Sequence, residues 1–292
     1  MHILNNEPLS RHTTYCIGGP VDCMLFPETH ADFLAVPEMI GDQPYMLLGN
    51  GSNVLFADQP FHAVIINLTR WTGITTKNSN LTVASGTSLA ELTAWAGEHA
   101  LSGYDFLAGI PGSVGGAVFM NAGAWGKYMD ALVQAVEVFQ LDTRSFKWYA
   151  QQELSFAYRR QTFLQPQDII TQVRLKATDT AQDAAENIKE IKRKRAEKHP
   201  CGLSCGSVFK NPPDQPAGKL IEACGLKGTK HGGAQISDKH TNFILNTGSA
   251  SFTDIMALIT LAQKKVKEKF DILLEPEVKI IQDIDSPLFR RL

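Results

Sequence analysis

Short apolar runs rich in β-branched residues recur along the chain, and polar residues or glycines bound each of them. Runs of this kind, about four to eight residues long, are typical of strands. The pattern predicts seven strands, over residues 45–49, 63–68, 81–85, 135–141, 168–175, 242–246 and 277–281.

Three other stretches have the pattern of a helix. Ser88 and Glu91 have the spacing of a capping box, which predicts a helix through about residue 101. Ser251 opens another helix, whose apolar positions recur on one face: Ile255, Met256, Ile259, Ala262, Val266 and Phe270. A third helix is predicted over roughly 181–198, ahead of Pro200. Because strands and helices follow one another without a regular βαβ alternation, we predict an α+β fold.

The length of 292 residues predicts about two domains. A polar, alanine-rich stretch near 178–185 is the best candidate for the boundary between them. We therefore predict a first domain over residues 1–178 and a second over residues 185–292. No internal repeat is evident.

Charge is nearly balanced along the chain, with a net charge of −2. No global field attracts nucleic acid, so we expect no nucleic-acid partner. The one basic run, over 189–199, follows an acidic stretch and is best interpreted as the solvated face of a helix. The alternative is that it attracts the phosphates of an anionic substrate or cofactor.

Five cysteines are spread along the chain without a CxxC pair: Cys16, Cys23, Cys201, Cys205 and Cys224. This predicts free thiols in a reducing cytoplasm, with neither a disulfide framework nor a metal site. The N-terminus has no apolar signal core. An uncharged stretch over 106–126 carries six glycines and Pro111, which indicate turns rather than a membrane helix. We expect a soluble, cytoplasmic protein without membrane insertion.

Two glycine-rich segments carry the strongest functional signal. In the first, Gly49, Asn50, Gly51, Ser52 and Asn53 follow a predicted strand, and backbone N–H groups in such a turn converge on an anion. The alternative is a tight β-turn. The segment has neither the third glycine of a dinucleotide fingerprint nor the Gly-Lys-Ser/Thr of a Walker loop.

The second segment combines small, uncharged residues over a longer stretch: Ile110, Pro111, Gly112, Ser113, Gly115, Gly116, Asn121 and Gly123. Small side chains allow the backbone to approach a flat or diphosphate ligand closely. A packed turn without a ligand is again the alternative. Two such loops, each after an apolar strand, favour a large phosphorylated cofactor.

Several motifs together resemble one known family. LGNGSNVLFAD (48–58) and AGIPGSVGGAVFMNAGAWG (108–126) are similar to the flavin-cradling loops of the UDP-N-acetylenolpyruvoylglucosamine reductase (MurB) family. YRRQTF (158–163), CGSVFKNP (205–212), GGAQISDKHTNFILN (232–246) and LEPEV (274–278) match its later motifs in order. The resemblance covers nearly the whole chain and is closest to the family's shorter subgroup.

The resemblance implies a fold and an activity. It implies a PCMH/vanillyl-alcohol-oxidase-type FAD-binding domain, whose two glycine loops hold the flavin, followed by a smaller α+β substrate-binding domain. It also implies that NADPH supplies the electrons that reduce the enolpyruvyl group of a small-molecule nucleotide sugar, enolpyruvyl-UDP-N-acetylglucosamine, to UDP-N-acetylmuramate for peptidoglycan synthesis. A monomer is expected. Alternatives are another flavin oxidoreductase of this fold, acting on a small alcohol or sugar, and a non-enzymatic nucleotide-binding module.

Arg159 and Glu277 are the candidates for stabilising the negative charge that such a reduction creates beside the substrate carboxylate. The Arg159 guanidinium is always charged and can bind a carboxylate through two N–H groups. Glu275 and Glu277 would face the same side of an extended segment, so periodicity does not choose between them, and the resemblance selects Glu277. One departure from the family is Gln161, where a serine is common.

Ser207, in CGSVFKNP, is the candidate proton donor. No GxSxG elbow surrounds it, and the residues after it do not begin a helix, which argues against a nucleophile and against a helix cap. Weaker candidates for substrate binding are Tyr158, Lys210, Asn211 and Gln235, which have suitable hydrogen-bonding groups.

Overall fold

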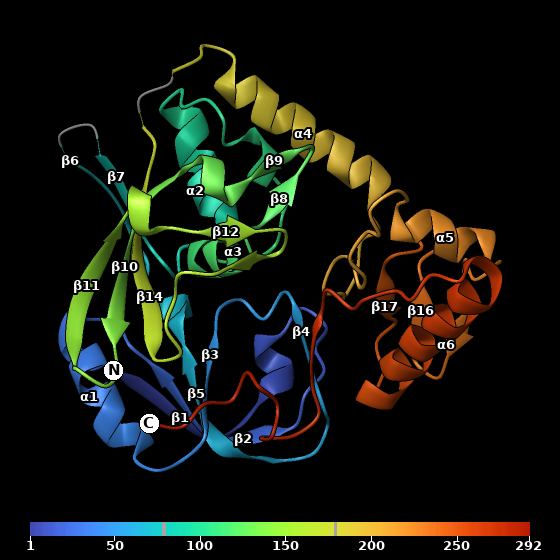
Figure 1. Cartoon of the computed structure of the whole chain (residues 1–292), viewed down its shortest axis with the longest axis horizontal. Coiled ribbons are helices and arrows are strands. Elements are labelled where there is room, and N and C mark those ends of the chain that lie inside the picture. Colours follow the sequence, from blue (N-terminus) through green and yellow to red (C-terminus); the bar gives the residue numbers. More distant parts are fainter. Residues whose placement is uncertain (78–79, 178–179) are drawn as a thin grey trace.

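The first unit of the fold is a four-stranded sheet near the N-terminus. The computed structural model describes residues 1–77, 80–177 and 180–292. The sheet has the order β1 (His2–Pro8), β2 (Pro20–Phe26), β5 (Phe61–Asn67) and β3 (Tyr45–Leu48). β1 is antiparallel to β2, whereas β2 and β3 both run parallel to β5. Helix α1 (His30–Ile40) packs beside this sheet (Figure 1).

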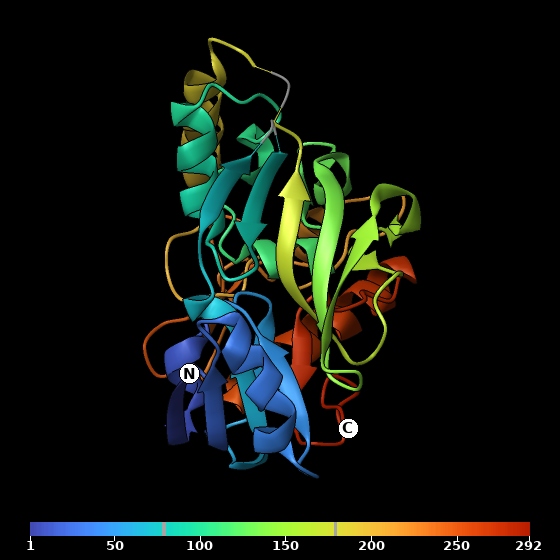
Figure 2. The same ribbon diagram turned by 90° about the vertical axis from the view of Figure 1, so that its left-hand side faces the viewer.

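The second unit is an antiparallel sheet of five strands, which lies above the first in Figure 2. Its order is β11 (Ser145–Ala150), β10 (Val133–Gln140), β14 (Asp168–Leu175), β7 (Asn80–Ala84) and β6 (Ile74–Lys77). Helices α2 (Leu89–Glu98) and α3 (Val114–Phe119) share a hydrophobic cluster with this sheet. Two short hairpins follow the helices, β8 (Gly123–Ala124) with β9 (Lys127–Tyr128) and β12 (Phe156–Ala157) with β13 (Arg160–Gln161).

The long helix α4 (Ala184–Lys198) leads from the second sheet to the C-terminal elements (Figure 1). These are α5 (Ala217–Ala223), the three-stranded sheet of β15 (Lys230–His231), β16 (Ala234–Ile236) and β17 (Ile244–Asn246), and α6 (Phe252–Phe270). The chain then returns to the N-terminal unit, where β18 (Lys279–Ile281) pairs in parallel with β4 (Val54–Phe56).

The hydrophobic core joins residues that are far apart in the sequence. One cluster unites Met24 and Phe56 near the N-terminus with Ile255 and Leu258 of α6. Because this cluster and the β4–β18 pair both link the two ends of the chain, the C-terminal elements are fixed against the N-terminal sheet.

The α+β class predicted from the sequence is confirmed, and all seven predicted strands are present, three of them shorter than expected. The three predicted helices are also confirmed. The Ser251 hydroxyl and the Asp254 carboxylate form a full capping box at α6, whereas at α2 Ser88 accepts from the Glu91 N–H. The elements that the pattern missed include β1, β2, β11 and α1. β1 and β11 are largely exposed strands, and α1 contains Pro37.

The predicted domain division remains a prediction. Residues 178–179, where the first domain was expected to end, lie outside the described residues, and α4 begins at Ala184. Across the described ranges, no helix combines the length and apolarity needed to cross a membrane.

Candidate active site

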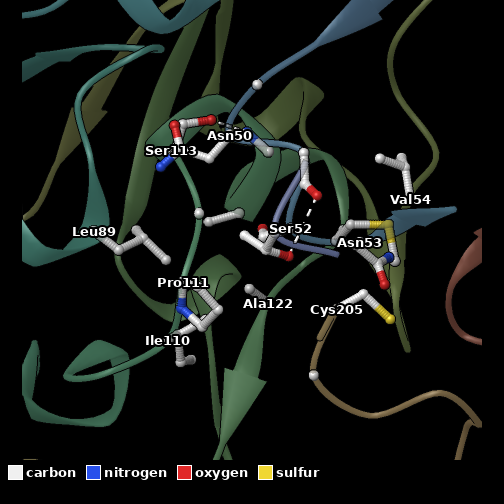
Figure 3. Close-up of a pocket in the computed structure, with 18 of the residues that line it drawn as sticks. Asn50, Ser52, Asn53, Val54, Leu89, Ile110, Pro111, Ser113, Ala122 and Cys205 are labelled. Carbon is white, nitrogen blue, oxygen red and sulfur yellow. Dashed lines mark hydrogen bonds between the residues drawn. The ribbon is translucent and has the colours of Figure 1, made fainter. Parts of the chain in front are cut away.

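A cavity of about 670 Å³ lies where the two sheets meet the C-terminal elements. Both glycine-rich loops line it, together with Arg159, Ser207 and Glu277. In Figure 3 the loop carrying Asn50, Ser52 and Asn53 faces Ile110 and Pro111 across the cavity, with Cys205 approaching from a third side. The sequence therefore folds so that its two strongest motifs enclose one space.

The first glycine loop connects β3 to β4 and packs against the N-terminal segment, the second glycine loop and the C-terminal segment. Gly51 has φ +60°, and a Cβ there would lie 2.0 Å from the His12 carbonyl oxygen, so only glycine fits. A Cβ on Gly49 would lie 2.5 Å from Ser113 Oγ, which shows how closely the two loops pack. Asn53 Nδ2 donates to the Glu277 carbonyl oxygen at 3.2 Å and ties this loop to the C-terminal segment.

The second glycine loop enters α3 at Ser113, whose hydroxyl accepts from the Gly116 N–H at 3.4 Å. All of its predicted residues line the cavity except Asn121. The Asn121 side chain instead donates to Asp130 at 3.1 Å and to the Ala157 carbonyl at 3.2 Å. Asn121 thus holds neighbouring loops together behind the cavity wall.

Arg159 and Glu277 form an ion pair at the cavity, with Arg159 Nε 2.9 Å from Glu277 Oε1. The Nε–H is not aligned for a hydrogen bond and has no other partner among the described residues. One terminal nitrogen, Nη1, donates to the Gly123 carbonyl at 3.3 Å. Arg159 itself has φ +60° in the turn between β12 and β13, a backbone strain of the kind that often accompanies functional residues.

Glu277 differs sharply from its neighbour Glu275. Glu277 is mostly buried, and burial raises the pKa of its carboxyl group, although the positive charge of Arg159 opposes the rise. Glu275 is exposed and pairs with Lys210 at the surface. The structure therefore separates two glutamates that periodicity alone could not.

Ser207 reaches the cavity because its segment pairs with the segment that carries Glu277. The Glu277 N–H donates to the Val208 carbonyl at 2.7 Å. The half-buried Ser207 lines the cavity, and its hydroxyl has no hydrogen-bond partner within the described part of the chain. Nearby, burial raises the pKa of the Cys205 thiol to about 12, so this cysteine is not a thiolate nucleophile.

The four predicted substrate-binding residues do not line the cavity. Tyr158 is exposed, with its ring beside the Arg159 guanidinium. Lys210 pairs with Glu275, the Asn211 side chain accepts from the first N–H of α5, and Gln235 donates to Asp238. Gln161, which replaces the common serine, accepts from two N–H groups of its own turn, those of residues 163 and 164.

Sequence reasoning missed two groups of lining residues. One face of α4 borders the cavity through Lys192, Arg195 and His199, and Arg195 Nε donates to the Ala108 carbonyl at 2.9 Å. The basic run was expected to be a solvated face, and only its alternative interpretation pointed to the cavity. The second group includes the charged residues Asp168, Lys279 and Arg290, and no sequence signal marked Arg290.

Comparisons with known proteins match both halves of the chain. Residues 21–144 match a family model described as an FAD binding domain, and residues 196–281 match the C-terminal domain of UDP-N-acetylenolpyruvoylglucosamine reductase. A reductase of that name from Thermotoga maritima is 41% identical over 277 residues, covering 94% of this chain and 97% of the relative. One from Caldanaerobacter subterraneus is 37% identical, covering 94% of this chain and 92% of the relative.

A solved structure agrees with the sequence comparisons. The crystal structure of the UDP-N-acetylenolpyruvylglucosamine reductase (MurB) from Thermus caldophilus superposes with a TM-score of 0.81 at 36% identity, covering 96% of this chain and 98% of that one. Fold, glycine loops and cavity thus define an FAD-dependent oxidoreductase with a PCMH-type flavin-binding domain. Within that class, the chain belongs to the UDP-N-acetylenolpyruvoylglucosamine reductase family.

Proposed function

We propose that this chain reduces the enolpyruvyl group of UDP-N-acetylenolpyruvoylglucosamine to UDP-N-acetylmuramate, with NADPH as the electron donor and FAD as the bound cofactor. The observation that carries this proposal is that Arg159, Ser207 and Glu277 line one cavity with both glycine loops. A non-enzymatic nucleotide-binding module would have no use for these three residues.

The residues of the cavity fit FAD. Its volume of about 670 Å³ lies within the range typical of cofactor sites. The loops at 49–53 and 110–116 present backbone and small side chains, which suits a diphosphate and a flat ring. When bound, FAD supplies the redox chemistry by taking hydride from NADPH and giving it to the terminal carbon of the enolpyruvyl double bond.

Arg159 and Glu277 would stabilise the charge that appears on the substrate. Hydride addition leaves negative charge on the carbon next to the substrate carboxylate, delocalised as an enolate. A guanidinium can bind that carboxylate through parallel N–H groups. Burial favours the protonated form of Glu277, and a neutral carboxyl group can donate a hydrogen bond to the developing oxyanion.

Ser207 would complete the reaction as the acid. Its O–H bond breaks as a C–H bond forms at the carbanionic carbon, and water returns a proton to the serine oxygen. A serine hydroxyl is a weak acid, but the carbanion is a strong base, so an ordinary serine is sufficient. The absence of a hydrogen-bond acceptor for Ser207 among the described residues leaves its proton available for the substrate.

The test is a turnover measurement with the purified protein and the enolpyruvyl nucleotide sugar. We expect a yellow protein that oxidises NADPH only when that substrate is present, with UDP-N-acetylmuramate as the product. A colourless protein that FAD cannot reconstitute would refute any flavin-dependent role. NADPH consumption that ignores the substrate would refute this activity in particular.

We also infer that one copy of the chain suffices for activity, because Arg159, Ser207, Glu277 and both glycine loops line the same cavity. The use of NADPH and of a nucleotide sugar is consistent with action in the cytoplasm.

A further inference from the structure

The last residues of the chain, 282–292, form a C-terminal tail that returns to the first sheet. Tyr45 and Arg290 exchange two backbone hydrogen bonds, of 2.9 and 2.8 Å, and thereby form an antiparallel bridge at the start of β3. The ring of Phe289 stacks on Phe61 at 5.9 Å. In Figure 1 the red tail crosses the N-terminal unit near β2 and β3 and ends close to β1. The tail is therefore a fixed part of the fold.

The tail and the candidate catalytic residues contact opposite ends of the segment that carries the first glycine loop. Glu277 lies beside Asn53, where the first glycine loop leaves for β4. Arg290 lies beside Tyr45, where β3 begins before that same loop. The four residues of β3 span roughly 13 Å at the usual rise per residue of a strand. The glycine loop thus lies between a catalytic end, at Glu277, and a tail end, at Arg290.

The tail end of the cavity is apolar apart from two charged residues. Met46, Leu164, Asp168, Ile170 and Arg290 all line the cavity. Met46 follows Tyr45 in β3, and Asp168, which lies in β14 with Ile170, acts electrostatically on Arg290. The Asp168 carboxylate is already used inside the protein, since it accepts from the Tyr149 hydroxyl at 2.9 Å and from Gln140 Nε2 at 3.2 Å. Arg290 is therefore the group at this end that has hydrogen-bonding capacity to spare.

The Arg290 guanidinium has one buried nitrogen, Nη1, whose N–H groups have no hydrogen-bond partner among the described residues. Arg290 forms no ion pair there, although the Asp168 carboxylate is near enough to attract it. The Tyr45 hydroxyl lies close to the guanidinium, and it too makes no hydrogen bond of good geometry within the described residues. Burial lowers the pKa of Arg290, in keeping with a desolvated cation.

An unsatisfied buried cation is costly, so a fold that retains one has a reason to do so. A guanidinium offers donors and no acceptor, which means that the missing partner carries acceptor atoms. The apolar walls on either side suit a flat ring. A purine with its attached ribose has both properties, with acceptor nitrogens on the ring and oxygens on the sugar.

We propose that Arg290 binds the adenosine half of FAD and makes the cavity select FAD over FMN. The inference rests on the proposed function in one respect: that function determines which end of FAD lies beside the candidate catalytic residues. The reactive ring must lie beside Arg159, Ser207 and Glu277, so the remainder of FAD extends along the first glycine loop towards the tail. FMN lacks the adenosine and would not reach Arg290.

The test compares flavin affinities of the full-length enzyme and of Arg290→Met, which keeps the length and the apolar stem of the side chain. Flavin fluorescence gives the dissociation constants of FAD and of FMN for the protein stripped of flavin. We expect Arg290→Met to weaken FAD binding by roughly 10- to 100-fold, as for the loss of a charged hydrogen bond, and to leave FMN binding unchanged. Arg291→Met is the matched control, because Arg291 is exposed and donates to the Asp42 carbonyl.

Two results would overturn the inference. Equal weakening of FAD and FMN would mean that Arg290 only supports the fold, and an unchanged FAD affinity would mean that it does not contact the cofactor. If the wild-type protein binds FAD and turns over, either result refutes this inference and leaves the proposed function intact. A wild-type protein that binds no flavin would refute both.

A second variant, Tyr45→Phe, guards against a simple loss of folding. Removing an unpartnered buried hydroxyl should leave the melting temperature of the flavin-free protein unchanged or higher. If the hydroxyl positions the Arg290 guanidinium for the cofactor, the same variant weakens FAD binding but not FMN binding. A lower melting temperature with unaltered FAD affinity would contradict the inference.

Discussion

At the scale of single residues, Ser207 offers the sharpest separation between a chemical and a structural role. Ser207→Ala removes a proton that only the second half of the reaction requires. We expect flavin reduction by NADPH to proceed normally, whereas reoxidation by the substrate slows on the order of 10²- to 10⁴-fold, the usual contribution of a general acid. Rapid mixing with an absorbance readout measures each half-reaction separately.

The matched control for Ser207 is Ser249→Ala, on an exposed turn of the C-terminal elements. It should leave both half-reactions at the wild-type rate. Equal losses of reduction and reoxidation in Ser207→Ala would show that the serine shapes the cavity rather than acting as an acid.

Motif residues that depend on backbone shape were predictable, and those that depend on side-chain partners were less so. The loop at 49–53 contains Gly51 because its backbone lies against the backbone at His12, which leaves no room for a Cβ. A glycine at such a position can be recognised in the sequence itself. Lys210 and Asn211 have types suited to a substrate, but the fold directs one to Glu275 and the other to the start of α5. Such partners come from residues distant in sequence, which a local pattern does not contain.

At the scale of elements, α4 has one side that faces solvent and another that borders the cavity. Its charged residues form i,i+3 and i,i+4 ion pairs in solvent, such as those of Arg193 with Glu190 and Glu197. Its opposite side borders the cavity through Arg195 and ends at His199. The charge pattern identified the solvated side. The cavity side depends on packing of the helix against the second glycine loop, which the charge pattern does not record.

The histidine at the end of α4 makes stability depend on pH. Burial, helped by the charges of Arg195, His240, Lys239 and Lys198, lowers the pKa of His199 from 6.5 to about 4. Between these values the unfolded chain binds more protons than the folded protein. The stabilising effect is therefore complete above pH 6.5 and declines as the pH falls towards about 4.

His199→Gln removes this titration. We expect the free energy of unfolding, measured with urea, to fall less steeply with acid in the variant than in the wild type. His62→Gln, at an exposed histidine of β5, should keep the wild-type slope. Identical slopes for all three proteins would rule out His199 as a source of acid sensitivity.

At the scale of the whole molecule, the two ends of the chain depend on each other. β4 has its pairing partner in β18, and Met24 and Phe56 share a core cluster with Ile255 of α6. A fragment of residues 1–177 would lack these partners and expose the apolar surface that they cover. We expect it to bind FAD far more weakly than the full chain and to aggregate, as measured by flavin fluorescence and light scattering.

Adding residues 184–292 as a separate chain during refolding serves as the control, and should restore part of the flavin binding. A fragment 1–177 that is monomeric and binds FAD as tightly as the whole protein would contradict the prediction. It would also favour the domain boundary expected from the sequence.

The α+β class and the order of most elements followed from local patterns, because capping residues and apolar runs act over a few positions. The return of the chain through β18 to β4 did not, since nothing near residue 279 records which strand it will meet. The meeting of Ser207 with Glu277 has the same origin, a backbone contact between segments about 70 positions apart.

The pairing of β4 with β18 also has a consequence for protein synthesis. A ribosome makes the glycine loops long before it makes residues 279–290. Until then the loop at 49–53 has neither the strand that braces it nor the tail that closes its cavity. Each new copy of the protein therefore acquires its complete flavin cavity only after those later residues have been made, so tight capture of the cofactor follows their synthesis instead of that of the glycine loops.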